Sequence, residues 1–320
     1  MGRSLKEQLL LNLVRLRYED VPVFLTVSSV LTQYIYAGSA SVAGSVGTSV
    51  GDPLNSAGIG AGVRYVERPT VTYSPLTGED FASQLLAPIP PELVFSLAQS
   101  GFPADALMLM SLEQLGGVRN APFDRPPIDS EEFRTFRRVV QLMVEISRRQ
   151  AAEMQKDEND PEARVVVFEE RVDPETQALI DELKEALDLS PQRSVFRLTE
   201  RTAGRAPDEL TVRARSLLAL MTFLAQGVEV PQAHSAEIQD MIAQDLVDGE
   251  QTSRFVPLRV FSEVEQPDDA FAAVHYRDHW FHIANTDPKS KQVFGLLNYL
   301  FQLQAPKTPV TAPVLTVPTG

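Results

Sequence analysis

The chain has 320 residues, enough for two or three domains and a sizeable buried core. Hydrophobic residues make up 43% and charged residues 22%, as in ordinary folded proteins. The formal net charge of −14 argues against a nucleic-acid partner, because phosphate binding needs clustered lysine and arginine. The absence of cysteine excludes thiol catalysis and cysteine-based zinc sites.

Residues 1–80 are predicted to form an N-terminal helix followed by a long β-hairpin. Leucines recur at helical spacing over residues 4–18, and Pro22 ends this amphipathic pattern. The chain has no run of 18 apolar residues, so no transmembrane helix is predicted. The first residues lack the small-residue cleavage site of a secretory leader, and no leader is expected in this sequence.

Residues 81–160 are predicted to be mainly helical. Two short helices begin near prolines and end at glycines, in APIPPELVFSLAQSG and FPADALMLMSLEQLGG. A longer helix is predicted from Ser130 to about Met154. Its arginines and glutamates interleave, which is typical of a solvated, ion-paired helix face. The polar stretch QKDENDPEA that follows is the expected domain boundary.

Residues 161–304 alternate strand and helix patterns and predict an α+β domain, so the fold class of the chain is α+β. Asp173 and Asp287 are expected to cap two of the helices, and Gly227 to end a third that begins near residue 206. Residues 305–320 are rich in proline and are predicted to form an extended tail.

The predicted hairpin spans residues 34–73 and carries the clearest pattern in the chain. Small and apolar residues alternate with period two, which indicates strand and not helix. A turn at Pro53 and Leu54 pairs Val50 with Ala57, and both apolar sets then fall on one side. The assembly or membrane-facing set is Val42, Val46, Val50, Ile59, Ala61, Val63 and Tyr65, and the lumen-facing set is Ser41, Ser45, Ser49, Gly60, Gly62 and Arg64.

Three interpretations of the hairpin are open. In the first, several copies each donate one hairpin to a membrane β-barrel, because a single open hairpin is not tolerated in lipid. In the second, a soluble hairpin packs on this protein or on a neighbouring copy. The third is a flexible glycine–serine loop, against which the regular alternation argues.

Three of the four histidines lie in the segment HYRDHWFHI. A turn at Asp278 and His279 places His275 opposite His282, which is the beginning of a zinc site if a carboxylate joins them. Ordinary strand positions beside aromatic residues are the favoured interpretation. No GxSxG motif or lysine-containing phosphate loop is present. No catalytic residue, metal ligand or cofactor is therefore predicted.

Several segments resemble an uncharacterised family of proteobacterial predicted outer-membrane and periplasmic lipoproteins. They are LLLNLVRLRYEDVPVFLTVSSV, RPTVTYSPLTGEDF, LLAPIPPEL, HWFHIANTDPKSKQVFGLL and APVLTVPTG. The resemblance implies export and lipid attachment at an N-terminal cysteine. This chain departs from that pattern because it has neither leader nor cysteine, and a native N-terminus would indicate the cytoplasm.

Together these patterns predict a non-enzymatic cell-envelope assembly protein. It is expected to form a homo-oligomeric ring whose hairpins build a β-barrel pore or anchor in the outer membrane. Expected partners are other copies, the outer membrane and further envelope proteins. The alternative is a soluble scaffolding subunit that uses the hairpin for intersubunit β-pairing, and an enzyme is the least favoured class.

Overall fold

The computed structural model describes residues 2–44, 57–75, 79–120, 130–158, 160, 163–201, 206–234 and 256–304. The chain divides into two compact units. One consists of Met1–Val23 and Thr77–Pro306, and the other of Phe24–Leu76 and Lys307–Gly320. The larger unit combines helices with two sheets, so the predicted α+β class is confirmed.

A six-stranded sheet forms one part of the larger unit, with strand order β4-β3-β8-β7-β6-β5. Its neighbours are antiparallel except β7 and β8, which run parallel. The strands are β3 (Leu112–Leu115), β4 (Val118–Arg119), β5 (Ala152–Lys156), β6 (Arg164–Phe168), β7 (Val195–Thr199) and β8 (Glu209–Ala214).

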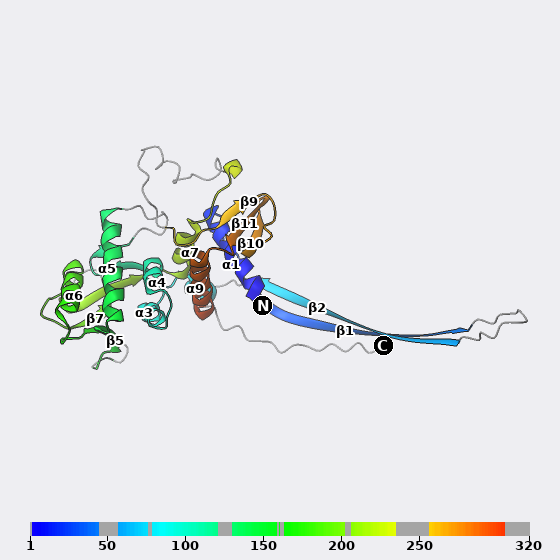
Figure 1. Cartoon of the computed structure of the whole chain (residues 1–320), viewed down its shortest axis with the longest axis horizontal. Coiled ribbons are helices and arrows are strands. Elements are labelled where there is room, and N and C mark those ends of the chain that lie inside the picture. Colours follow the sequence, from blue (N-terminus) through cyan, green and yellow to red (C-terminus); the bar gives the residue numbers. More distant parts are fainter. Residues whose placement is uncertain are drawn as a thin grey trace, which may run out of the picture. The chain divides into compact units, whose positions relative to one another are not determined.

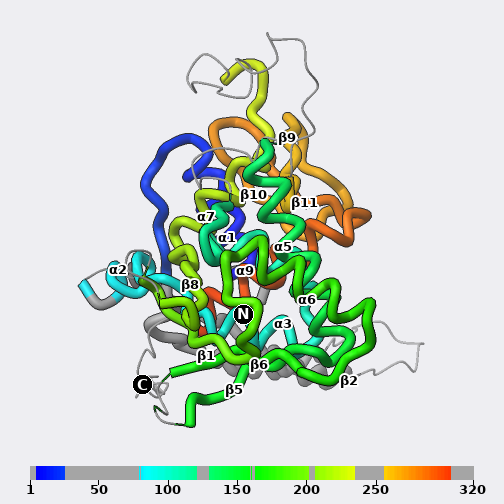
Figure 2. Tube along the Cα trace, turned by 90° about the vertical axis from the view of Figure 1, so that its left-hand side faces the viewer, coloured from blue at the N-terminus to red at the C-terminus, as the bar shows by residue number. Residues whose placement is uncertain are grey.

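Helices pack against this sheet (Figure 2). Together they line a small apolar cavity. The helices are α3 (Pro91–Gln99), α4 (Ala104–Ser111), α5 (Glu131–Arg148) and α6 (Pro174–Ala186). The α5 helix begins where the Ser130 hydroxyl accepts a hydrogen bond from the Phe133 amide, and it buries one apolar stripe that includes Phe136 and Ile146. The remaining face of α5 is solvated.

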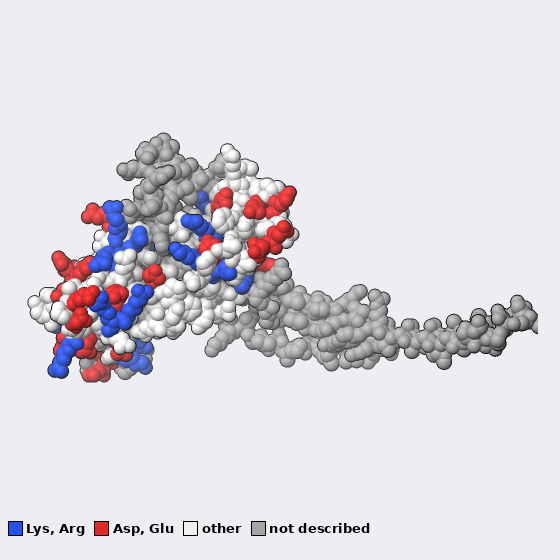
Figure 3. Space-filling view, viewed as in Figure 1, with Lys and Arg blue, Asp and Glu red and all other residues white. Residues whose placement is uncertain are grey.

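The solvated face of α5 is ion-paired, as predicted. Arg138 donates to both carboxylate oxygens of Glu182 on α6, at 2.6 and 2.7 Å. Arg149, at the end of α5, pairs with Glu145 at 2.9 Å and with Glu175 at 2.8 Å. Figure 3 shows positive and negative side chains intermixed on this face of the larger unit.

A second layer of the larger unit contains a three-stranded sheet with order β10-β11-β9. The strands are β9 (Phe261–Glu263), β10 (Ala270–Tyr276) and β11 (His279–Ala284). The helices of this layer are α1 (Gly2–Arg17), α2 (Glu79–Leu86), α7 (Leu217–Ala225) and α9 (Pro288–Gln304), with a short 3₁₀ turn, η1 (Gln232–His234). Leu9 and Leu13 of the predicted leucine pattern are fully buried. The α1 helix packs against β10 and α7 (Figure 1).

The C-terminal end of α4 is held by two buried polar side chains. Arg215, 2% exposed, donates to the Met110 carbonyl at 2.7 Å, and its guanidinium lies 4.3 Å from the Phe223 ring centroid. Burial lowers the pKa of Arg215 to about 10, although the charge of Glu113 opposes this shift. Asn120 donates to the Leu109 carbonyl at 2.7 Å. Both side chains satisfy carbonyls that the helix end leaves without partners.

Several predicted elements are confirmed. The Asp173 carboxylate accepts from two amides at the start of α6, and hydrogen bonds from Thr176 hold the pKa of Asp173 below its usual range. Asp287 caps α9 through the Ser290 amide at 3.1 Å. Within residues 161–304, where the sequence predicts alternating strands and helices, residues 164–168 and 195–199 form β6 and β7.

The helix expected to begin near residue 206 is wrong over its first half. Residues 209–214 form β8, and α7 begins only after Ser216, whose hydroxyl accepts from the Ala219 amide at 3.1 Å. Leu210 and Val212 are buried because β8 lies between β7 and β3 in the sheet. Packing by distant strands therefore overrides the local helical pattern.

Residues 112–115 and 152–154, both expected to be helical, also lie in strands, β3 and β5. The α4 helix ends at Ser111, where the chain enters β3. The α5 helix ends at Arg148, and Gln150 then adopts a φ of 56° that turns the chain into β5. The polar stretch expected as a domain boundary connects β5 to β6, which pair within the same sheet.

Two glycines provide a matched test of this packing. A Cβ on Gly227 would collide with the Leu258 carbonyl oxygen, where the chain forms a parallel bridge between Val228 and Val260. Gly295 lies in the middle of α9 and a Cβ there would meet nothing within 4 Å. Gly227 therefore permits two backbone segments to approach closely, whereas Gly295 has no neighbour that would exclude a side chain.

We expect Gly227→Ala to lower the free energy of unfolding by about 1–3 kcal/mol or more, because the backbone of residue 258 must move. Gly295→Ala should raise it by about 0.5–1 kcal/mol through helix propensity. Urea denaturation of both variants measures the difference. Equal effects of the two substitutions would contradict the close contact at Gly227.

Candidate functional site

The smaller unit contains the predicted hairpin. Strands β1 (Leu25–Gly44) and β2 (Ala57–Pro75) are antiparallel and pair along their whole length (Figure 1). The hairpin is confirmed, and its strands extend beyond the predicted start at Tyr34 to Leu25. One irregularity, between Val27 and Ser29, leaves Ser28 outside the ladder and marks a bulge. It lies near the root of the hairpin, the end of the ladder where Leu25 pairs with Pro75.

The predicted register is wrong by a fixed displacement. Val42 pairs with Ile59 and Gly44 with Ala57, whereas a two-residue turn at Pro53 and Leu54 required Val42 to face Tyr65. Register in a hairpin follows from the length of its connection, and a glycine- and alanine-rich ladder offers few bulky pairs to favour one alignment. The sequence pattern therefore defined the faces but not the alignment.

The displacement amounts to six positions, an even number, so the two alternating sets are preserved. Val42 still pairs with a member of its own set, Ile59, and Ser41 pairs with Gly60. Within the predicted sets, the ladder includes Val42, Ile59, Ala61, Val63, Tyr65, Ser41, Gly60, Gly62 and Arg64. Val46, Val50, Ser45 and Ser49 lie outside the described residues.

Charged residues occupy a single zone of the ladder. Arg64 pairs with Ala37, Glu67 with Tyr34, and Arg68 with Gln33. Beyond that zone, the rows from Gly38↔Val63 to Gly44↔Ala57 contain only glycine, alanine, serine, valine and isoleucine. These seven rows extend about 23 Å along the strands.

Each strand of the ladder has one outer edge. Among the strands that the structure describes, β1 pairs with β2 and with no other strand. Outer edges of long strands present unpaired amides and carbonyls, and such edges favour pairing with another chain. The hairpin therefore combines two long unpaired edges with a charge-free segment, the rows from Gly38↔Val63 to Gly44↔Ala57.

The chain leading to the hairpin is fixed in the larger unit by Asn12. This fully buried amide donates to the Val23 carbonyl at 2.9 Å and accepts from the Val23 amide at 2.8 Å. Arg15 donates to the Val21 carbonyl at 2.9 Å. One helix thus satisfies the backbone of an extended segment, as a neighbouring strand would.

A polar and aromatic cluster surrounds Tyr18 at the end of α1. The Tyr18 hydroxyl lies 2.7 Å from His234 Nδ1, and the rings of His234 and His279 are 4.8 Å apart. The Arg277 guanidinium lies 4.8 Å from the Tyr18 ring centroid. The cluster joins three segments that are far apart in the sequence, and the sequence carried no motif that identified it.

Asp20 connects this cluster to the β10–β11 hairpin. Its carboxylate accepts a hydrogen bond from the Tyr276 hydroxyl and pairs with Arg277 at 3.1 Å. Burial raises the pKa of Tyr276, and the hydrogen bond to Asp20 raises it further. The same carboxylate therefore fixes both the turn of the small sheet and the chain just before the hairpin.

The predicted histidine pair is not formed. The turn consists of Arg277 and Asp278, both with positive φ, so His275 pairs with Trp280 and His282 with Ala273. The turn lies one residue earlier than expected because this two-residue connection has the positive-φ geometry of a tight hairpin turn. In the described ranges, no three His, Asp or Glu side chains are arranged to hold a metal ion.

No protein-family model, curated protein or solved structure matches this chain. Within the described residues, no helix has the length and apolar character needed to span a membrane.

The register gives the first prediction of this site, because a chain without cysteine allows unambiguous disulfide mapping. Val42→Cys with Ile59→Cys should form an intrachain disulfide on mild oxidation, since paired residues in an antiparallel ladder have Cα atoms about 4.5–5.5 Å apart. Val42→Cys with Tyr65→Cys should not. Non-reducing gels, run after oxidation in excess wild-type chain, separate intrachain from interchain products. Cross-linking of the second pair alone would favour the two-residue turn.

The second prediction concerns the hairpin root. Asn12→Ala should lower the free energy of unfolding by about 1–3 kcal/mol, because it removes two hydrogen bonds and leaves the Val23 backbone without these partners. Asn298→Ala, at a half-buried position of α9 where the amide accepts one exposed hydrogen bond from Gln302, is the control and should change it by less than about 0.5 kcal/mol. A chemical denaturation curve for Asn12→Ala that overlays the wild-type curve would contradict this role.

Proposed function

We propose that this protein is a non-enzymatic assembly protein of the cell envelope. Several copies each contribute one β1–β2 hairpin, and the hairpins pair edge to edge into a β-barrel that serves as a pore or anchor in the outer membrane. The observation that carries this proposal is the isolated two-stranded ladder, whose strands of 20 and 19 residues have no other partner among the described strands.

Edge pairing between copies follows from the antiparallel geometry. The outer edge of β1 on one copy pairs with the outer edge of β2 on the next, so the contact is heterologous and repeats around a ring. Closing the ring satisfies the edge amides and carbonyls of every copy. A ring also avoids the open edge that would otherwise recruit further chains.

The membrane assignment rests on the composition of the outer rows. At the strand tilt of about 40° that is usual in such barrels, the charge-free rows from Gly38↔Val63 to Gly44↔Ala57 cover roughly 18 Å of the ~25 Å apolar band. Val42 and Ile59 belong to the set that faces lipid in this arrangement, and Ser41 and Gly60 to the set that faces the lumen. Arg64, Glu67 and Arg68 mark the side of the band nearer the root.

A soluble scaffolding subunit is the second candidate, and the length of the ladder favours it. Nineteen paired rows extend about 63 Å, much more than the apolar band requires. The charged rows nearer the root therefore lie in water in either arrangement. Edge pairing between copies over these rows needs no lipid.

Two neighbouring substitutions test the assignment. Val42→Arg places a charge on the lipid side, where an arginine at the bilayer midplane costs about 2–4 kcal/mol, and it should abolish insertion into vesicles. Ser41→Arg changes the adjacent residue on the opposite side and should leave insertion intact while altering conductance. The measurements are vesicle co-sedimentation, single-channel conductance, and light scattering in buffer and detergent.

The outcomes separate the two candidates. Loss of assembly by Val42→Arg in plain buffer, with no conductance for any variant, supports the soluble scaffold. A wild-type chain that stays monomeric in both buffer and detergent would overturn hairpin-mediated assembly altogether. Equal tolerance of both substitutions would contradict the assignment of two distinct faces.

A further inference from the structure

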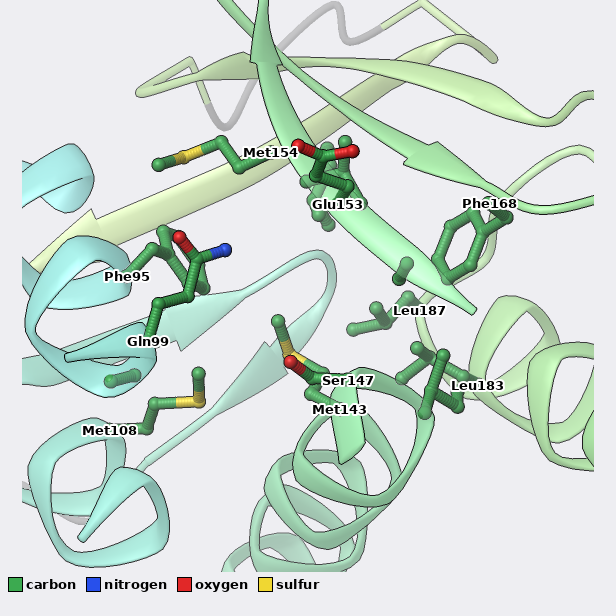
Figure 4. Close-up of a pocket in the computed structure, with 15 residues that line it drawn as sticks. Phe95, Gln99, Met108, Met143, Ser147, Glu153, Met154, Phe168, Leu183 and Leu187 are labelled. Carbon is green, nitrogen blue, oxygen red and sulfur yellow. The ribbon is translucent and has the colours of Figure 1, made fainter. Parts of the chain in front are cut away.

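A small apolar cavity lies inside the larger unit, between the six-stranded sheet and helices α3–α6 (Figure 4). Its volume is about 70 Å³. The sheet contributes alternate residues of paired strands: Ala152 pairs with Phe168, and Met154 with Val166. The full lining is Phe95, Ala98, Gln99, Met108, Met143, Ile146, Ser147, Ala152, Glu153, Met154, Val166, Phe168, Leu183, Leu187 and Leu210.

Methionine is concentrated in this lining. Met108, Met143 and Met154 are three of the seven methionines in the chain, and they enter from α4, α5 and β5 (Figure 4). Methionine side chains are unbranched and flexible, so they adapt to apolar ligands of variable shape. Rotamer changes of these three side chains would adjust the shape of the cavity to a ligand.

The cavity has a polar, solvent-exposed rim. Gln99, Ser147 and Glu153 are exposed, whereas Phe168 and Leu210 deeper in the lining are buried. Such an arrangement differs from a sealed packing defect, because a ligand can enter from solvent and leave a polar end at the rim. Apolar sites with a few polar groups at one end are typical of small-molecule binding.

Size and charge limit the ligand. An engineered cavity of about 150 Å³ accepts benzene, so 70 Å³ is too small for a ring and suits a narrow chain. Among the described lining residues Glu153 alone is charged, and its carboxylate accepts a hydrogen bond from Gln155 at 3.2 Å. A ligand carboxylate would find no cation among these described residues and would meet a like charge.

We propose that this cavity binds the end of an uncharged, linear alkyl chain, supplied by a lipid or by a free amphiphile. The chain enters between α3 and β5, its terminal carbons lie among the three methionines, and its polar head stays at the rim. This inference does not depend on the role of the hairpin.

A series of 1-alkanols tests the proposal on the full-length protein labelled with ¹³C at the methionine methyl groups. The signals of Met108, Met143 and Met154 should shift, whereas those of the buried Met110 and Met221, which are absent from the lining, should not. Each added methylene should tighten binding about fourfold until the cavity is full, and further lengthening should then have little effect.

Two kinds of variant give matched controls. Ala152→Leu fills the cavity and should weaken 1-octanol binding at least tenfold, and Ala98→Leu does the same from α3 should the first variant fail to fold. Glu153→Lys should improve decanoate binding several-fold. Glu158→Lys makes the same charge change on an exposed residue outside the lining and should not.

The outcomes decide the proposal and the source of the chain. The proposal is supported if the shifts are confined to the three lining methionines and the filling variants abolish them. Binding of didecanoyl phosphatidylcholine as well as 1-decanol then indicates that a lipid supplies the alkyl chain. Binding of 1-decanol alone indicates a free amphiphile. No shift with any alkanol, or equal shifts of Met110 and Met221, would overturn the proposal and identify the cavity as a packing defect.

Discussion

A two-stranded antiparallel ladder satisfies only one edge of each of its strands. In β1 and β2 this leaves two long rows of alternating amide and carbonyl groups, because the described strands offer no third partner. Water can satisfy these groups in solution, but a membrane interior cannot. The proposed assembly of several copies follows from this constraint, and the need for a closed ring follows from it as well.

The larger unit fixes the chain just before the hairpin. Asn12 satisfies both backbone groups of Val23, and Asp20 pairs with Arg277 and accepts from Tyr276. The two Asn12 hydrogen bonds replace the pairing that an adjacent strand would supply to an extended segment. The chain up to Val23 is therefore held by side chains of the larger unit.

The larger unit also has a feature that the assembly role does not use. Its sheet and helices pack closely over most of the core, yet leave a cavity of about 70 Å³ that three methionines surround. A well-packed interior has few voids larger than a water molecule. An apolar void with an exposed polar rim therefore differs from ordinary packing, and it is the place where the proposed alkyl chain would bind.

The sequence by itself determined features that a few neighbouring residues encode. Asp173 and Asp287 cap their helices because a cap needs only a side chain and the next three amides. Period-two alternation defined the hairpin and its two sets of residues, which survived a displacement of six positions. Alternation depends on parity alone, so it is insensitive to the alignment of the strands.

The tertiary structure alone decided everything that depends on distant partners. The register of β1 with β2 requires the length of the connection, and small residues do not specify it. Residues 209–214 became β8 because β3 and β7 pair on its two sides, although the local pattern favoured helix. The contacts of Tyr18 with His234 and of Asp20 with Arg277 join residues more than 200 positions apart. No local pattern encodes such contacts, because only the packing of whole elements brings these side chains together.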